Sequence, residues 1–130
     1  MKNIILKLLE YIYYFSLIIL FILYLYPGSL IGYFLYGNLE QQPNLIPNPI
    51  GTSINHFIFF SYITILALIV RSKAINIFTD YKFILLISFF LEIFHFIIPN
   101  RAFEFYDLTA NVLGVLTIIL LERFRKWLNY

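Results

Sequence analysis

Apolar residues in this sequence gather into four stretches, and the prolines, the glycines and most of the charged residues lie between or beside them. The stretches cover residues 4–26, 54–71, 82–98 and 106–122. The first is long enough for a hydrocarbon layer about 30 Å thick, while the other three are near the lower limit of about 17 residues for a crossing. The pattern predicts an all-α protein with four transmembrane helices in an antiparallel bundle.

The composition supports a membrane environment. Hydrophobic residues make up 62 % of the chain and charged residues 12 %, against roughly 45–50 % and about 25 % in ordinary soluble domains. A chain of 130 residues cannot bury so much apolar surface in its own interior, so we expect a single membrane domain over 1–130. Residues 4–26 are followed by no cleavage motif, which favours a retained helix over a signal peptide. The absence of cysteine excludes disulfides and thiolate metal sites.

The distribution of lysine and arginine orients this bundle. Eight of the nine basic residues fall at one end of the expected topology, namely Lys2, Lys7, Arg71, Lys73, Lys82, Arg123, Arg125 and Lys126. By the positive-inside rule that end is cytoplasmic, so both termini are expected there. The opposite end holds Arg101 and a long outer loop over 27–53, which is apolar over 30–36 and irregular over 37–51. Aromatic residues near the span ends are expected to be interfacial anchors: Tyr11, Tyr13, Tyr14, Tyr24, Tyr26 and Trp127.

Several polar residues fall inside the apolar stretches, where they are costly and often functional. Glu92 and His95 are three residues apart and therefore share a helical face. His95 and Arg101 are the cationic partners that the sequence offers for Glu92. Asp107, Asn111 and Gly114, at the start of the fourth stretch, are spaced four and three residues apart and also share a face. In the expected topology these side chains meet in the outer half of the bundle or at its mouth: His56, Glu92, His95, Arg101, Asp107, Asn111 and Gly114.

These residues allow more than one interpretation. They can form a buried hydrogen-bonded network that holds short helices together, with Gly114 permitting a close helix contact. Glu92 and His95 have the spacing of a carboxylate–histidine metal motif, but such sites use two of these pairs with further carboxylates, so we expect no metal. No serine or threonine has the sequence context of a nucleophile.

The segment from Glu92 through Pro99 and Arg101 to Asp107, Asn111 and Gly114 resembles the signature of the VanZ-like family. The resemblance implies a small bacterial plasma-membrane protein of about four helices, and the family's namesake is associated with low-level resistance to the glycopeptide teicoplanin. Two departures are present. Thr52-Ser53 stand where the family has Asp-Lys, and His95 stands where it has glutamine.

The function we favour is non-enzymatic binding of an envelope amphiphile or a glycopeptide-related ligand at the outer leaflet, with Arg101 contacting a phosphate or carboxylate. Three alternatives are acid–base catalysis by Glu92 and His95 on a lipid-linked substrate, a small drug exporter, and a purely structural polar network. We expect the lipid bilayer as a partner, no cofactor and no nucleic acid. The sequence leaves the oligomeric state open.

Overall fold

The computed structural model describes residues 2–43, 51–71 and 76–129. Within these ranges the secondary structure is helical: α1 (Lys2–Leu25), α2 (Leu30–Tyr36), α3 (Gly51–Arg71), a 3-10 turn η1 (Ile77–Thr79), α4 (Tyr81–Phe94) and α5 (Phe105–Leu128). Among the described helices, α1, α3 and α5 are long and apolar enough to cross a membrane. The prediction of an all-α membrane protein is therefore confirmed at this coarser level.

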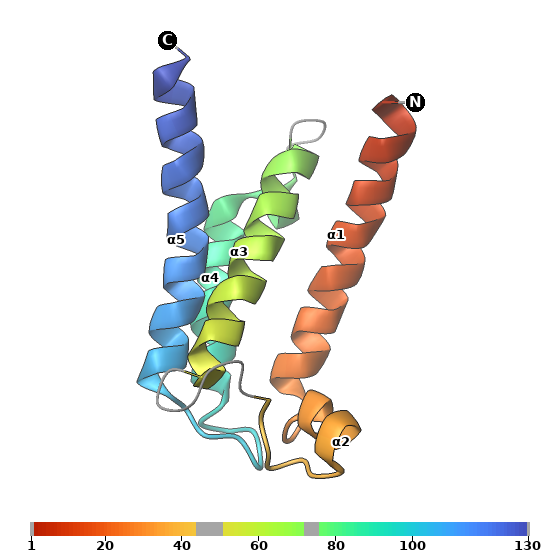
Figure 1. The fold of residues 1–130 in the computed structure, drawn as a ribbon, viewed down its shortest axis with the longest axis vertical. Helices are drawn as coiled ribbons and strands as arrows, with labels where there is room; N and C mark the ends of the chain where they lie inside the picture. Colours follow the sequence, from red (N-terminus) through yellow and green to blue (C-terminus); the bar gives the residue numbers. More distant parts are fainter. Residues whose placement is uncertain (1, 44–50, 72–75, 130) are drawn as a thin grey trace.

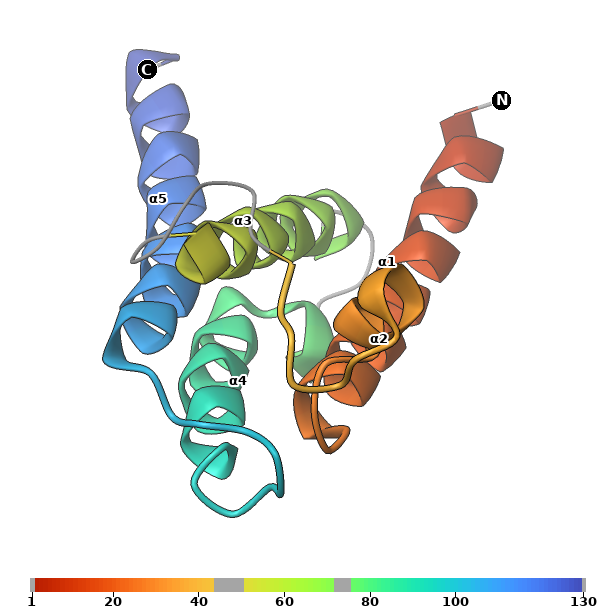
Figure 2. The ribbon, with the colours of Figure 1, turned by 60° about the horizontal axis from the view of Figure 1, so that its bottom comes forward.

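The four longer helices run side by side, with α1, α3, α4 and α5 alternating in direction (Figure 1). Both termini lie at the end of the molecule opposite α2 (Figure 1). Viewed from the α2 end, α3 lies beside α5 and α4, while α1 stands on the far side of α3 from α5 (Figure 2). The packing of α3 against α5 is the most extensive helix contact.

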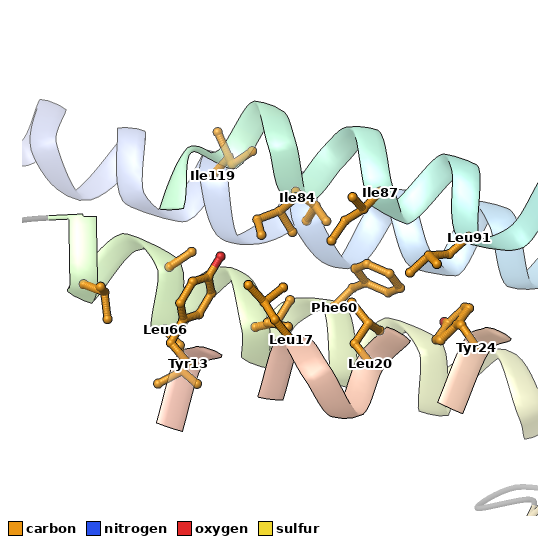
Figure 3. Packing of buried hydrophobic residues seen from close by; sticks show 14 residues of the cluster. Tyr13, Leu17, Leu20, Tyr24, Phe60, Leu66, Ile84, Ile87, Leu91 and Ile119 are labelled. Carbon is orange, nitrogen blue, oxygen red and sulfur yellow. The ribbon is translucent and has the colours of Figure 1, made fainter. Parts of the chain in front are cut away.

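The core follows from helical periodicity. Tyr13, Leu17, Leu20 and Tyr24 are spaced by four, three and four residues, so they form one face of α1. That face meets buried residues of the other helices, among which Figure 3 labels Phe60, Leu66, Ile84, Ile87, Leu91 and Ile119. The expectation that Tyr13 and Tyr24 are interfacial anchors is wrong, because they are only 0 % and 8 % exposed. Tyr11 and Trp127 are well exposed, at 73 % and 71 %.

Helix ends differ from the predicted boundaries in physically clear ways. The third helix was expected over 82–98 but ends at Phe94, because the chain then tightens into turns in which Phe96 and Ile97 donate to carbonyls three residues back. With 14 residues, α4 has a length of about 21 Å, short of a typical hydrocarbon layer. The α5 helix continues past the expected 122 to Leu128.

The stretch predicted as an outer loop, 27–53, contains ordered helix. Ser29 caps α2 by accepting a hydrogen bond from the Gly32 N–H at 2.9 Å, and α3 begins at Gly51, earlier than the predicted 54. A Cβ built on Gly32 would lie 1.6 Å from the Gln41 carbonyl oxygen. Residues 38–43 therefore fold back tightly over α2. The irregular segment expected over 37–51 falls partly, at 44–50, outside the described residues, as does Lys73.

Candidate functional site

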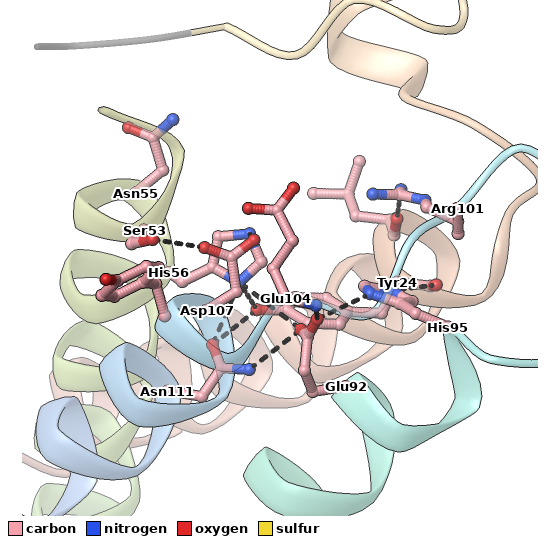
Figure 4. A network of polar contacts seen from close by, with 12 residues as sticks. Tyr24, Ser53, Asn55, His56, Glu92, His95, Arg101, Glu104, Asp107 and Asn111 are labelled. Atoms are coloured by element: carbon pink, nitrogen blue, oxygen red, sulfur yellow. Dashed lines mark hydrogen bonds and ion pairs between the residues drawn. The ribbon is translucent and has the colours of Figure 1, made fainter. Parts of the chain in front are cut away.

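Buried polar side chains from α1, α3, α4 and α5 meet toward the α2 end of the bundle (Figure 4). Five of them are at most 8 % exposed: Tyr24, Glu92, His95, Asp107 and Asn111. His56 joins them with 11 % of its side chain exposed. We call these six residues and Ser53 the polar cluster. Among the described residues, every buried side-chain nitrogen and oxygen has a hydrogen-bond partner.

Asn111 is the hub of the polar cluster. Its Oδ1 accepts from the Tyr24 hydroxyl at 2.8 Å and lies 3.1 Å from His56 Nδ1. Its Nδ2 donates to the Ser88 carbonyl at 3.3 Å and lies 3.5 Å from Glu92 Oε2. One side chain of α5 therefore contacts α1, α3 and α4.

Glu92 Oε1 has two partners on the loop side. His95 Nδ1 lies 3.1 Å from Glu92 Oε1, and the Glu104 backbone N–H donates to the same oxygen at 3.3 Å. His95 is the C-cap of α4 and lies three residues after Glu92, so the two side chains are neighbours. Its Nε2 lies 3.2 Å from the Tyr24 carbonyl oxygen, an acceptor, so this nitrogen carries a proton.

Asp107 begins the other half of the cluster. Ser53 Oγ donates to Asp107 Oδ1 at 2.5 Å, and Asp107 Oδ2 lies 3.5 Å from His56 Nε2. Ser53 is therefore the hydrogen-bond donor that orients Asp107.

Gly114 lets α5 approach α3 closely enough for these contacts. A Cβ built there would lie 2.6 Å from the Phe57 carbonyl oxygen and 3.2 Å from Phe60 Cβ. This agrees with the expected close helix contact, because both atoms belong to α3. Gly114 itself adds no polar side chain to the cluster.

Arg101 has a different environment from the one expected. Its Nη2 donates to the Leu23 carbonyl and its Nε lies 3.4 Å from the Tyr26 carbonyl oxygen, so the guanidinium caps the C-terminal end of α1. Of the two partners expected for Glu92, His95 is the one in contact, with its Nδ1 3.1 Å from Glu92 Oε1. Partial burial lowers the pKa of Arg101, an effect opposed by Tyr24, Glu92 and Asp107.

A cavity of about 120 Å³ opens beside the polar cluster, between α1, α2 and α3. Its wall includes Tyr24, Leu30, Asn55, His56, Phe59 and Arg101. Asn55 is oriented by a hydrogen bond from its Nδ2 to the Pro43 carbonyl at 2.6 Å. Polar groups and apolar side chains therefore share one wall.

Of the residues singled out from sequence, the structure brings His56, Glu92, His95, Asp107 and Asn111 into one cluster, with Gly114 beneath it and Arg101 on the cavity wall. Sequence analysis missed Tyr24 and Ser53. A tyrosine on the same face of α1 as the core residues Leu17 and Leu20 was the available signal for Tyr24. No known protein family, curated protein or solved structure matches this chain.

Proposed function

We propose that this chain is a multi-pass membrane protein whose cavity binds the anionic headgroup of an amphiphile. The observation that carries the proposal is the cavity wall, where Arg101 stands among apolar side chains. A volume of about 120 Å³ suits a headgroup fragment, because whole drug-sized ligands occupy about 300–1,000 Å³. The alkyl part would then remain in the bilayer.

The surroundings of the cavity support a site at a membrane surface. The α2 helix exposes Tyr33, Phe34, Leu35 and Tyr36, with Phe34 81 % exposed, as is typical of a segment lying in an interface. Arg101 is the single lysine or arginine between Lys82 and Arg123. An anion entering this cavity would therefore meet one cation, held in place by α1.

The proposal includes four crossings with both termini in the cytoplasm. Since the two termini lie at the same end of the molecule (Figure 1), an even number of crossings is needed if α1, α3 and α5 all span. The short α4 would serve as the fourth crossing by adding the turns that follow Phe94. Residence in a bacterial plasma membrane and membership of the VanZ-like family belong to the same proposal.

The binding role is favoured over acid–base catalysis by the position of the two catalytic candidates. Glu92 and His95 are 0 % and 3 % exposed and bond to each other. A general acid or base must come within hydrogen-bonding reach of its substrate. We therefore assign Glu92 and His95 to support of the cavity wall through Tyr24, whose carbonyl faces His95 at 3.2 Å.

The test is a titration of the purified protein in nanodiscs with a polyprenyl phosphate, and with the uncharged polyprenol as the matched ligand. Binding is measured by native mass spectrometry. We expect saturable binding of the phosphate, and binding at least about tenfold weaker by Arg101→Ala, since a hydrogen bond to a charged group is worth about 1.5–3 kcal/mol and each 1.4 kcal/mol is about tenfold. Arg123→Ala, at the opposite end of the bundle, is the control. A second titration uses teicoplanin.

Equal binding of polyprenol and polyprenyl phosphate would overturn the headgroup assignment. If Arg101→Ala and Arg123→Ala bind the phosphate alike, Arg101 is only the cap of α1. Saturable binding of teicoplanin but not of the polyprenyl phosphate would assign the cavity to a glycopeptide-related ligand.

A further inference from the structure

His56, Glu92 and Asp107 bring metal-ligating atoms together from three different helices. One ligand atom can be chosen from each so that all three lie within 4.8 Å of one another. His56 Nε2 and Asp107 Oδ2 are 3.5 Å apart. Two ligands of a tetrahedral zinc ion, each about 2.1 Å from the metal, are separated by about 3.4 Å. The spacing of this pair therefore already fits a shared ion.

The proton on His56 is assigned by its neighbours. Asn111 Nδ2 faces the Ser88 carbonyl, which only accepts, so Oδ1 is the atom that faces His56 and Tyr24. The single hydroxyl proton of Tyr24 goes to that oxygen. His56 Nδ1, 2.7 Å from the Tyr24 oxygen and 3.1 Å from Asn111 Oδ1, must then be the donor. In the neutral ring this leaves the lone pair of Nε2 facing Asp107.

Asp107 and Glu92 are each held by hydrogen bonds to one carboxylate oxygen. The other oxygen of each carboxylate faces His56. Asp107 Oδ1 accepts from Ser53, and Oδ2 is the atom that faces His56 Nε2. Glu92 Oε1 is engaged by His95 and the Glu104 N–H, while Oε2 has only longer contacts, at 3.5 Å to Asn111 Nδ2 and 3.9 Å to His56 Nδ1, the protonated nitrogen of the ring that presents Nε2 to Asp107. Outer partners that orient inner ligands in this way are typical of metal centres.

Charge gives an independent reason for an ion. Two carboxylates buried together in a bundle of apolar helices repel each other and lose their hydration. His95 contacts Glu92 and offsets part of its charge, and a divalent cation held with the neutral imidazole of His56 would stabilise the charge that remains. We propose that His56, Glu92 and Asp107 bind a divalent transition-metal ion of the zinc type, because imidazole and carboxylate ligands suit such ions. The three ligands leave a coordination position, as in zinc sites that accept a further ligand.

This revises the sequence-based expectation of no metal. That expectation weighed Glu92 with His95 as a pair, whereas the ligand set uses His56 and Asp107 and leaves His95 as an outer partner of Glu92. His56 also lies on the cavity wall. A bound ion would therefore stand next to the proposed headgroup site without depending on it.

The experiment titrates Co²⁺ into the full-length protein, purified in detergent and treated with a chelator. Visible d–d absorption is recorded, followed by displacement with Zn²⁺. We expect a band of tetrahedral intensity that saturates at one ion per chain and disappears when Zn²⁺ is added. Zn²⁺ should also raise the thermal unfolding midpoint, because it binds the folded state. His56→Ala and Asp107→Asn should abolish the band.

His95→Gln is the matched control, because it also removes an imidazole from the cluster but leaves the three ligands in place, so it should retain the band. A wild-type protein with neither a Co²⁺ band nor a higher midpoint in Zn²⁺ would overturn the proposal, even if the ligand variants fail to fold. Loss of the band in His95→Gln to the same extent as in His56→Ala would overturn the ligand set. An equal midpoint rise with Ca²⁺ or Mg²⁺ would overturn the role of the imidazole.

Discussion

Replacing Asn111 with alanine tests the polar cluster as the element that holds the bundle together. Asn111 is fully buried and bonds to Tyr24 of α1, His56 of α3 and Ser88 of α4. The variant removes these contacts together and leaves their partners inside the bundle (Figure 4).

The size of the effect follows from these three contacts. Hydrogen bonds between membrane helices contribute about 0.6 kcal/mol each on average, which sets a floor of about 2 kcal/mol. Leaving a buried polar group without its partner costs about 1–3 kcal/mol, and the alanine also leaves a small cavity. We therefore expect Asn111→Ala to lower the free energy of unfolding by about 2–5 kcal/mol.

The assay is equilibrium unfolding in mixed micelles with increasing SDS, followed by near-ultraviolet circular dichroism. Tyr13 and Tyr24 are buried, so they report tertiary packing rather than helix content. Asn129→Ala is the control, since Asn129 is exposed at the end of the same helix and should change stability by less than about 0.5 kcal/mol. If Asn111→Ala were as stable as Asn129→Ala, the cluster would not stabilise the bundle.

The remaining predictions concern packing, a buried hydroxyl and pH. Gly114→Ala should lower stability by about 1–2 kcal/mol in the same SDS assay, because its Cβ would lie 2.6 Å from the Phe57 carbonyl oxygen; an unchanged midpoint would refute the close contact. Tyr13→Phe should cost about 1 kcal/mol by SDS titration, because the hydroxyl donates to the Phe78 carbonyl; no loss would refute that bond. Burial, with nearby carboxylates, raises the pKa of Glu104 above the ordinary 4.5. The folded state therefore binds the Glu104 proton more tightly than the unfolded state does. The stabilisation that follows from this is lost as pH rises through the raised pKa of the folded state. Glu104→Gln should remove that part of the pH dependence of the thermal midpoint, whereas an identical profile would refute the shift.

The candidate site was predictable to the extent that helical spacing controls it. Glu92 and His95, and likewise Asp107, Asn111 and Gly114, share faces because residues three and four apart on a helix are neighbours. The turn after Phe94 could not be predicted in this way. It places His95 at the end of α4, in contact with both Glu92 and the Tyr24 carbonyl.

The environments of Tyr24 and Arg101 could not be predicted from the sequence pattern either. A tyrosine near the end of an apolar helix is usually an interfacial anchor, and only the packing of α1 against α3 and α4, with Asn111 reaching in from α5, makes Tyr24 a buried donor. The sequence likewise suggested Arg101 as a partner for the buried glutamate. In the structure, the guanidinium of Arg101 donates to the Leu23 and Tyr26 carbonyls at the C-terminal end of α1.

The amino-acid sequence by itself determined that the protein is helical and belongs in a membrane, because these depend on local periodicity and on total apolar content. It also determined which polar residues occupy apolar helices. The tertiary structure alone decided their partners: Asn111 as hub, Ser53 on Asp107, and His56 rather than His95 between the two carboxylates. Such pairings depend on the rotation and closeness of neighbouring helices, which are set by contacts between residues far apart in the chain.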